Sequence, residues 1–391
     1  AGPKPHAVKP TLEQLALNRE LSQLDSPVAV LEALQGASER GIAINGTNLA
    51  TGIHRIASRG GGLKPNLLRN PWLGALLNLI YKRLSENGDE FNARELSSVA
   101  WAIAKLGFKV DLVFSAIRVE MERRGLALFN WHDLSNLMWA HAVTPGRGKG
   151  WEEPLMGVVR DAEVRPLAGM VPQALSNLAW AVSTLGLSHG GNSAQCLLLR
   201  LAEHACSLGV SAFKPQEVSA LLWAMAVGGA RAPRLFSMVE EHVVQGSMAG
   251  YNAQKVSALA CAFAQVGHSA PQLFSMIAES LMERAMASFN AANTASIAWA
   301  FASVGFETEE VLGAVEERVW QVGLQGFGET HLVLLCWAFA YAKYRGLTES
   351  LGRDTLSMVE VELRKRRFKD VPDAHLATLA WAFARQGHPG G

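Results

Sequence analysis

Side chains that can form hydrogen bonds without carrying charge recur at three fixed positions of a repeated pattern in this sequence. The positions lie 3, 7 and 14 residues after an aromatic or apolar anchor residue such as Phe91 or Phe129, and are called offsets 3, 7 and 14 here. Their polar occupants, mostly uncharged, are Arg94, Ser98, Lys105, His132, Asn136, Gln173, Asn177, Thr184, Gln216, Gln254, Gln265, Ser296, Ser303, Thr330, Tyr341, Thr378 and Arg385.

These residue types suit the recognition of nucleobases. Asn, Gln, Ser and Thr offer both the donors and the acceptors that base edges require. Proteins read RNA sequence mainly from unpaired bases, and helical repeats read one base each through two or three side chains. The alternative is an inert solvated surface, but such a surface more often carries Glu and Lys. We therefore predict that the three columns contact base edges of single-stranded RNA.

Contacts to RNA phosphates require cations. The densest basic run in the chain consists of Arg364, Lys365, Arg366, Arg367 and Lys369. A solvated helix end is the alternative interpretation, because the helix dipole favours cations there. We predict that this run contacts phosphates, of single-stranded or ribosomal RNA.

Composition and motifs exclude several other functions. The formal net charge is only +1, far from that of a strongly basic nucleic-acid binder. No apolar run is long enough to cross a membrane. The sequence holds no phosphate-binding Walker loop, metalloprotease motif, hydrolase elbow or paired-cysteine zinc motif. We expect no enzyme, no cofactor, no metal and no small-molecule substrate. The cysteines at 196, 206, 261 and 336 are expected to be small buried hydrophobes.

The elements that position these columns follow from a repeat. Seven of the eleven tryptophans lie ten positions after an anchor residue, and an alanine follows each: Trp101, Trp139, Trp180, Trp223, Trp299, Trp337 and Trp381. Cys261 stands at this position in the unit that begins at Tyr251. Between Phe213 and Phe327 the anchors are 38 residues apart. Such regular self-similarity is typical of stacked structural repeats.

Each repeat is predicted to contain two helices. Helix A runs from about offset 2 to offset 15 and often ends at a glycine, and helix B fills most of the remainder. We predict an all-α fold, a right-handed α-solenoid superhelix of about eight two-helix repeats of roughly 38 residues. Residues 71–391 form the array, and 1–70 form a degenerate repeat or cap with His54 at the tryptophan position. The last repeat stops after helix A, so we expect more chain or a partner there.

The periodicity of helix A predicts which face is buried. Offsets 5, 8, 9 and 12 fall on one stripe and are mostly apolar. We place the Trp-Ala pair beside that stripe as core packing, where each tryptophan could bury roughly 150–250 Å². On this interpretation the tryptophans are not a base-stacking platform.

The stretches 91–107 and 213–226 resemble the octotricopeptide repeat. That family has units of this length and the pattern Phe-x-Pro-Gln-x-Leu-x-Asn-x-x-Trp-Ala, here seen as Phe213-Lys-Pro-Gln-Glu-Val-Ser-Ala-Leu-Leu-Trp-Ala. The resemblance covers about 91–387, and more weakly from 44. It implies an RNA-binding α-solenoid of a mitochondrion or chloroplast that acts in RNA stability, processing, splicing or translation, or as an accessory ribosomal protein. It also implies that helix A carries the base-reading residues.

Two functions are compatible with these features of the sequence. The first is a non-catalytic binder of organellar single-stranded RNA, whether mRNA, intron or ribosomal RNA. The second is a scaffold that holds RNA and proteins inside a large ribonucleoprotein complex such as an organellar ribosome. The near-neutral charge favours the second.

Overall fold

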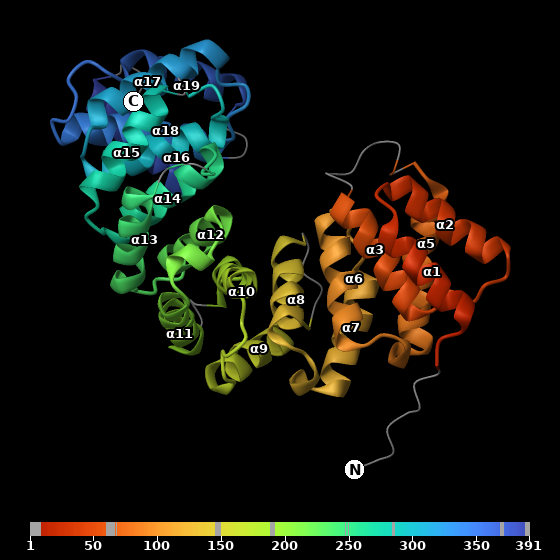
Figure 1. The fold of residues 1–391 in the computed structure, drawn as a ribbon. Helices are drawn as coiled ribbons and strands as arrows, with labels where there is room; N and C mark the ends of the chain where they lie inside the picture. The colour runs from red at the N-terminus through yellow and green to blue at the C-terminus, as the bar shows by residue number, and fades with distance from the viewer. Residues whose placement is uncertain are drawn as a thin grey trace. The chain divides into compact units, whose positions relative to one another are not determined.

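The computed structural model describes residues 9–59, 67, 69–144, 150–187, 192–246, 248, 250–283, 286–367 and 371–387. Within these residues the regular structure is entirely helical, with 19 α-helices and no strand (Figure 1). The all-α prediction is therefore confirmed. No helix in this described part of the chain is both long enough and apolar enough to cross a membrane.

Helices of two kinds alternate along the chain. The A helices are α1 (Leu12–Gln23), α3 (Gly46–Arg59), α6 (Ala93–Lys105), α8 (Trp131–Val143), α10 (Pro172–Thr184), α12 (Pro215–Val227), α14 (Ala253–Val266), α16 (Ala291–Val304), α18 (Glu329–Tyr344) and α20 (Asp373–Gln386). The B helices are α2 (Pro27–Glu39), α5 (Pro71–Glu86), α7 (Asp111–Arg124), α9 (Glu152–Val164), α11 (Asn192–Leu208), α13 (Pro233–Gln245), α15 (Pro271–Glu283), α17 (Thr308–Val322) and α19 (Arg353–Lys365).

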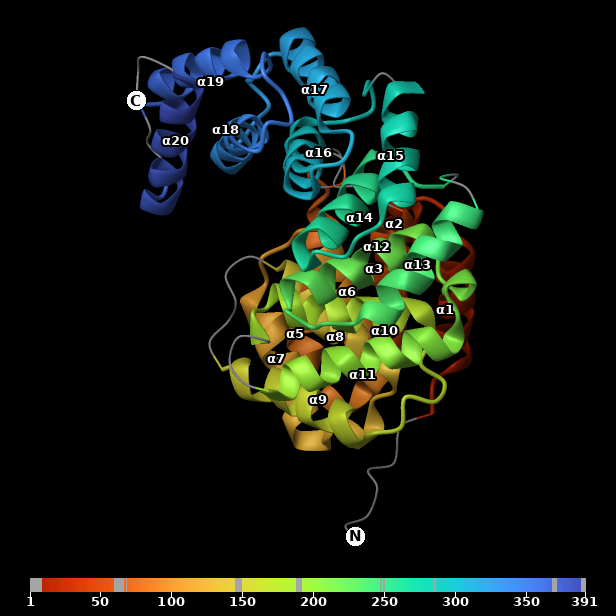
Figure 2. The same cartoon turned by 90° about the vertical axis from the view of Figure 1, so that its left-hand side faces the viewer.

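The chain forms two compact units, residues 1–197 and residues 198–391. In the N-terminal unit, A helices α1, α3, α6, α8 and α10 pack one against the next, and B helices α5, α7 and α9 do the same. In the C-terminal unit the two series are α12 to α20 and α13 to α19. Figure 2 shows α16, α18 and α20 in succession, next to α17 and α19. Packing of A on A and B on B is the arrangement of an α-solenoid.

The local sequence sets where each A helix begins and ends. Asn92 and Asn130, at offset 1, are N-caps that accept hydrogen bonds from the backbone N–H of Glu95 (3.0 Å) and Asp133 (2.9 Å). Gly305 ends α16 with φ of 79°, a conformation that other residues rarely adopt. The predicted start of helix A near offset 2 is therefore confirmed.

The core lies between the A and B series. In α6 the predicted stripe, Leu96, Val99, Ala100 and Ile103, is completely buried. The A and B helices of the C-terminal unit also share edge-to-face phenylalanine pairs. Phe263 meets Phe236 with ring centroids 5.0 Å apart, and Phe301 meets Phe274 at 5.1 Å. Phenylalanines thus fill much of the core, together with other buried rings such as Trp151 and Tyr251.

Three arginines five residues before an anchor tie one repeat to the preceding one. Each guanidinium donates hydrogen bonds to two backbone carbonyls of the preceding anchor turn, and we call this contact the arginine strap. The donors and acceptors are Arg124 to Phe91 (2.5 Å) and Gly88 (2.7 Å), Arg165 to Phe129 (2.6 Å) and Leu126 (2.8 Å), and Arg366 to Phe327 (2.7 Å) and Leu324 (3.2 Å). The carbonyls of Gly88, Leu126 and Leu324 also accept the backbone N–H of the anchor residue that follows, so the strap adds a second hydrogen bond to each.

Candidate nucleic-acid interface

The first predicted column, at offset 3, lies in the first turn of the A helices. All of its predicted residues, Arg94, His132, Gln173, Gln216, Gln254 and Thr330, are exposed. Exposure leaves their side chains able to meet a ligand. The capping geometry accounts for this placement, because offset 3 follows the N-cap by two residues and points away from the core stripe.

The second column, at offset 7, is more covered. Ser98, Asn177, Ser296 and Thr378 are half-buried. Asn136 is only 7% exposed, and its amide nitrogen lies 3.3 Å from Nδ1 of His132 one turn earlier. The hydroxyl of Thr378 donates to the carbonyl of Ala374 at 3.1 Å. A ligand can therefore reach the side chains at offset 7 less easily than those at offset 3.

The third column, at offset 14, is mixed. Lys105, Gln265 and Arg385 are exposed, and Thr184, Ser303 and Tyr341 are half-buried. The amide nitrogen of Gln265 donates to the carbonyl of Ala226 in the preceding repeat at 3.3 Å, and the hydroxyl of Ser303 donates to the carbonyl of Trp299 at 2.7 Å. The cations of this column, Lys105 and Arg385, are thus open to an anionic ligand.

The tryptophans at offset 10 lie beside these columns and are only partly covered. Six are half-buried and Trp381 is 38% exposed, whereas the alanines that follow them, such as Ala102 and Ala300, are completely buried. At about 100° per residue, offset 10 lies about 150° from the centre of the core stripe but about 20° from offset 3. The prediction of core packing is therefore right for the alanines and holds only in part for the tryptophans, which are half-covered and contact the ring of the next repeat, as Trp299 does with Trp337.

In the N-terminal unit the aromatic rings form a short series with cations around it. Trp101 lies between His54 (ring centroids 4.9 Å apart) and Trp139 (6.5 Å), and Nζ of Lys105 lies 4.6 Å from the Trp101 ring. The pKa of His54 is lowered from its usual value, first by burial and then by the positive charges of Lys105, Arg55, Arg94 and His132. This part of the surface favours anions.

The predicted phosphate-binding run lies at the end of α19, a B helix. Arg364, Lys365 and Arg367 are exposed, with Arg364 paired to Glu360 at 2.6 Å. Arg366 instead forms an arginine strap and pairs with Glu362 at 2.8 Å and Glu329 at 3.2 Å, a structural use that we did not predict. Lys369 lies outside the described residues. The run and the A-helix columns belong to different helix series.

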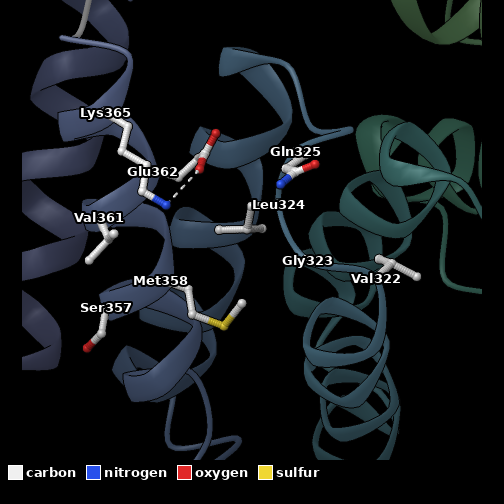
Figure 3. A pocket seen from close by; sticks show the side chains of 9 residues that line it. All are labelled: Val322, Gly323, Leu324, Gln325, Ser357, Met358, Val361, Glu362 and Lys365. Atoms are coloured by element: carbon white, nitrogen blue, oxygen red, sulfur yellow. Dashed lines mark ion pairs between the residues drawn. The ribbon is translucent and has the colours of Figure 1, made fainter.

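A hollow of about 540 Å³ lies between the end of α17 and α19 (Figure 3). Its lining is Val322, Gly323, Leu324, Gln325, Ser357, Met358, Val361, Glu362 and Lys365. Nζ of Lys365 lies 4.0 Å from a Glu362 oxygen. No residue of the three columns lines this hollow, so it is not part of the predicted base-reading surface.

The cysteines differ in exposure. Cys206 and Cys336 are buried as predicted, Cys261 is half-buried, and Cys196 is exposed, which corrects the prediction for Cys196. Cys261 occupies the tryptophan position, and its thiol lies 3.4 Å from the carbonyl oxygen of Ser296. Burial raises the pKa of Cys261 to about 12 and also raises the pKa of Cys336. Among the described residues, no group of three His, Cys, Asp or Glu side chains could hold a metal ion.

Alkylation of the folded protein at pH 8 should therefore modify Cys196 first. With a pKa of about 12, only about one Cys261 thiol in ten thousand is ionised at that pH. Mass spectrometry of peptides after brief iodoacetamide treatment measures the order of modification. Equal labelling of Cys196 and Cys261 without denaturant would contradict the burial seen here. Urea should remove the difference.

These features define a helical-repeat protein whose A helices present polar and aromatic side chains. A family model described as RNA-editing substrate-binding complex 6 protein matches residues 169–385, which is more than half of the chain. The chain therefore belongs to this family. No curated protein matches its sequence. The narrower resemblance to octotricopeptide repeats stays a prediction.

Proposed function

We propose that the protein is a non-catalytic component of an RNA-editing complex and binds single-stranded RNA through its A helices. One observation carries this proposal. The matched region, 169–385, begins at the anchor turn of α10 and ends at Arg385 in α20, so it contains the columns from Gln173 onward. The family's name speaks of substrate binding in RNA editing, and the matched helices carry the exposed hydrogen-bonding side chains.

The columns contain, among others, two kinds of side chain, amides that contact base edges and cations that contact phosphates. Gln173, Gln216 and Gln254 at offset 3 are exposed and carry a donor and an acceptor on one amide, as needed for adenine or another base edge. Arg94, Lys105 and Arg385 supply charge for phosphates. Unpaired RNA fits this arrangement, because its base edges are open to side chains.

Binding of RNA fragments over a salt series tests the proposal. Affinity for an editing substrate should exceed that for a random polymer and should fall as salt rises. The double substitution Gln216→Ala and Gln254→Ala should weaken binding of the preferred RNA by roughly 1–3 kcal/mol per lost base contact. Gln272→Ala is the matched control, because Gln272 is exposed on the B helix α15. Equal affinity for all RNAs, with an intact helical spectrum, would defeat sequence-specific binding.

A scaffold of a large ribonucleoprotein complex is the second candidate, and a ribosome is one such complex. The net charge of +1 favours it, since it limits the electrostatic part of RNA affinity. A scaffold should sediment with one large particle after ribonuclease treatment, held by protein contacts. An RNA-binding factor should leave that particle when the RNA is digested.

The absence of catalysis and the location in an organelle belong to the same proposal. Membership of an RNA-editing family favours the mitochondrion and lends nothing to the chloroplast. Fractionation of cells that produce a tagged protein tests the location. Incubation of the purified protein with RNA, followed by analysis of the products, tests the absence of catalysis.

A further inference from the structure

We propose that the half-exposed aromatic rings of the A helices are stacking surfaces for the bases of single-stranded RNA. This inference rests on the proposed function and adds a second kind of contact to it. The site is most complete in α16, α18 and α20, where five rings follow one another. We call them the C-terminal aromatic ladder: Trp299, Trp337, Tyr341, Tyr344 and Trp381.

Within the ladder, one face of Trp337 already holds a planar group. The Tyr341 ring lies against Trp337 with centroids 4.4 Å apart and an angle of 13° between the planes. A nucleobase stacks on tryptophan in the same way. Trp299 and Trp337 are tilted by 37° at 6.4 Å, so Trp337 does not lie parallel over the face of Trp299.

Exposure separates the ladder from the core. Tyr344 on α18 is 56% exposed, whereas Phe339 on the same helix and Phe301 on α16 are completely buried. The phenylalanines fill the space between the helix series. Rings that only completed this packing would be covered as well. A run of aromatic surface left in water is typical of a binding site.

The charged side chains near the rings indicate which kind of ligand binds there. The Arg345 guanidinium lies 5.8 Å from the Tyr341 ring, and that of Arg385 lies 4.7 Å from the Tyr344 ring. Offsets 3, 7, 10 and 14 carry no aspartate or glutamate in any of the eight repeats. An anionic ligand with flat faces matches both features. Single-stranded RNA has this combination, and stacking platforms with nearby cations are typical of proteins that bind it.

Stacking also assigns a role to the repeats that carry no Asn or Gln in the three columns. The repeats of α16 and α20 have alanine at offset 3, and that of α18 has leucine at offset 7. These positions have no side-chain hydrogen bond to offer a base edge. All three helices keep the tryptophan at offset 10. We infer that this part of the array binds bases by their faces, with little dependence on base identity.

The test uses the full chain and single-stranded RNA that contains 2-aminopurine, whose fluorescence falls when it stacks. The wild-type protein should quench this fluorescence on binding. Trp337→Leu should reduce the quenching and weaken binding by about 5- to 50-fold, because the platform that Trp337 forms with Tyr341 is lost and with it one stacked base. Trp337→Phe should keep most of both. The slope of affinity against salt should stay the same in each variant, since phosphate contacts remain.

Two further variants separate stacking from folding. Trp320→Leu is the matched control, because Trp320 is 54% exposed on the B helix α17 and lies outside the ladder. It should bind and quench like wild type. Trp381→Leu repeats the test in α20, where a more exposed ring carries less packing. Thermal unfolding by circular dichroism confirms that each variant is folded.

The outcomes separate this inference from the proposed function. If the protein binds RNA but both ladder variants retain full affinity and quenching, stacking is overturned and RNA binding stands. If the wild-type protein binds no RNA, both fall. If folded ladder variants bind RNA normally but fail to co-purify with a protein that wild type retains, the ladder is a protein contact and the inference is overturned.

Discussion

Replacing Phe301 by alanine is expected to lower the free energy of unfolding by about 3–5 kcal/mol. The ring is fully buried in α16 and meets Phe274 of α15 edge to face at 5.1 Å. Its removal therefore takes away buried apolar surface, leaves a cavity and ends an aromatic pair that joins the A and B helices. Urea unfolding followed by far-ultraviolet circular dichroism measures the change.

Because each repeat contacts mainly its neighbours, the damage should be local at first. Hydrogen exchange should rise first in α15, α16 and α17. Trp320→Ala is the control, since this large ring is 54% exposed on α17, and its removal should change stability by less than about 0.5 kcal/mol. A loss below about 1 kcal/mol for Phe301→Ala would show that this site collapses without a cavity.

Arg165→Met should lower the free energy of unfolding by about 2–4 kcal/mol, since a hydrogen bond from a charged donor contributes about 1.5–3 kcal/mol and the losses of two bonds from one side chain are not additive. Its guanidinium bonds to the carbonyls of Phe129 (2.6 Å) and Leu126 (2.8 Å) and pairs with Asp161 at 2.7 Å. Methionine keeps most of the volume, so the measured loss reports the strap together with the Asp161 ion pair and the contact of the guanidinium with the Trp131 ring at 5.2 Å. Arg165→Lys should recover less than half, because an ammonium lacks the planar fork that reaches both carbonyls.

The same helix supplies the control for the strap. Arg160 is also in α9, but its side chain is 50% exposed and its ion pair is with Glu153, which is 81% exposed. Arg160→Met should therefore change stability by less than about 0.5 kcal/mol. Thermal unfolding of the two variants side by side gives the comparison. Equal losses would mean that α9 needs charge in general and not the two carbonyl contacts.

Much of the fold follows from local sequence. Asn92, Asn130 and the other N-caps fix where A helices begin, and the period of Leu96, Val99 and Ile103 fixes their buried face. Such signals act within one or two turns, so sequence alone reveals them. They also place the exposed column at offset 3, which the structure confirms as exposed.

The tryptophans show where prediction from sequence was only partly right. Their bulk suggested the core, although the helical angle at offset 10 places them near the polar columns. The prediction thus rested on the size and hydrophobicity of tryptophan and not on its angular position on the helix. The phenylalanines at offset 12, such as Phe263 and Phe301, carry the core instead. The helical angle alone places the tryptophan rings at the partly exposed face.

The arginine straps could not be found by local rules. Arg366 stands in a basic run, so its charge suggested phosphate. Its partners are carbonyls of Phe327 and Leu324, about one repeat earlier, and only the stacking of repeats brings them into reach. Arg364 and Arg367 in the same run stay exposed. Neighbours in sequence thus have different roles, which depend on which way each side chain points.

The straps also bear on how such an array can lengthen or shorten. Each joins an arginine five residues before one anchor to carbonyls of the preceding anchor turn, as Arg124 does with Phe91 and Gly88. Duplication or loss of a whole repeat presents every arginine with an equivalent pair of carbonyls. Loss of half a repeat leaves the arginine and the carbonyls without partners. The strap is therefore preserved when the array changes by one complete repeat and is broken when it changes by half a repeat.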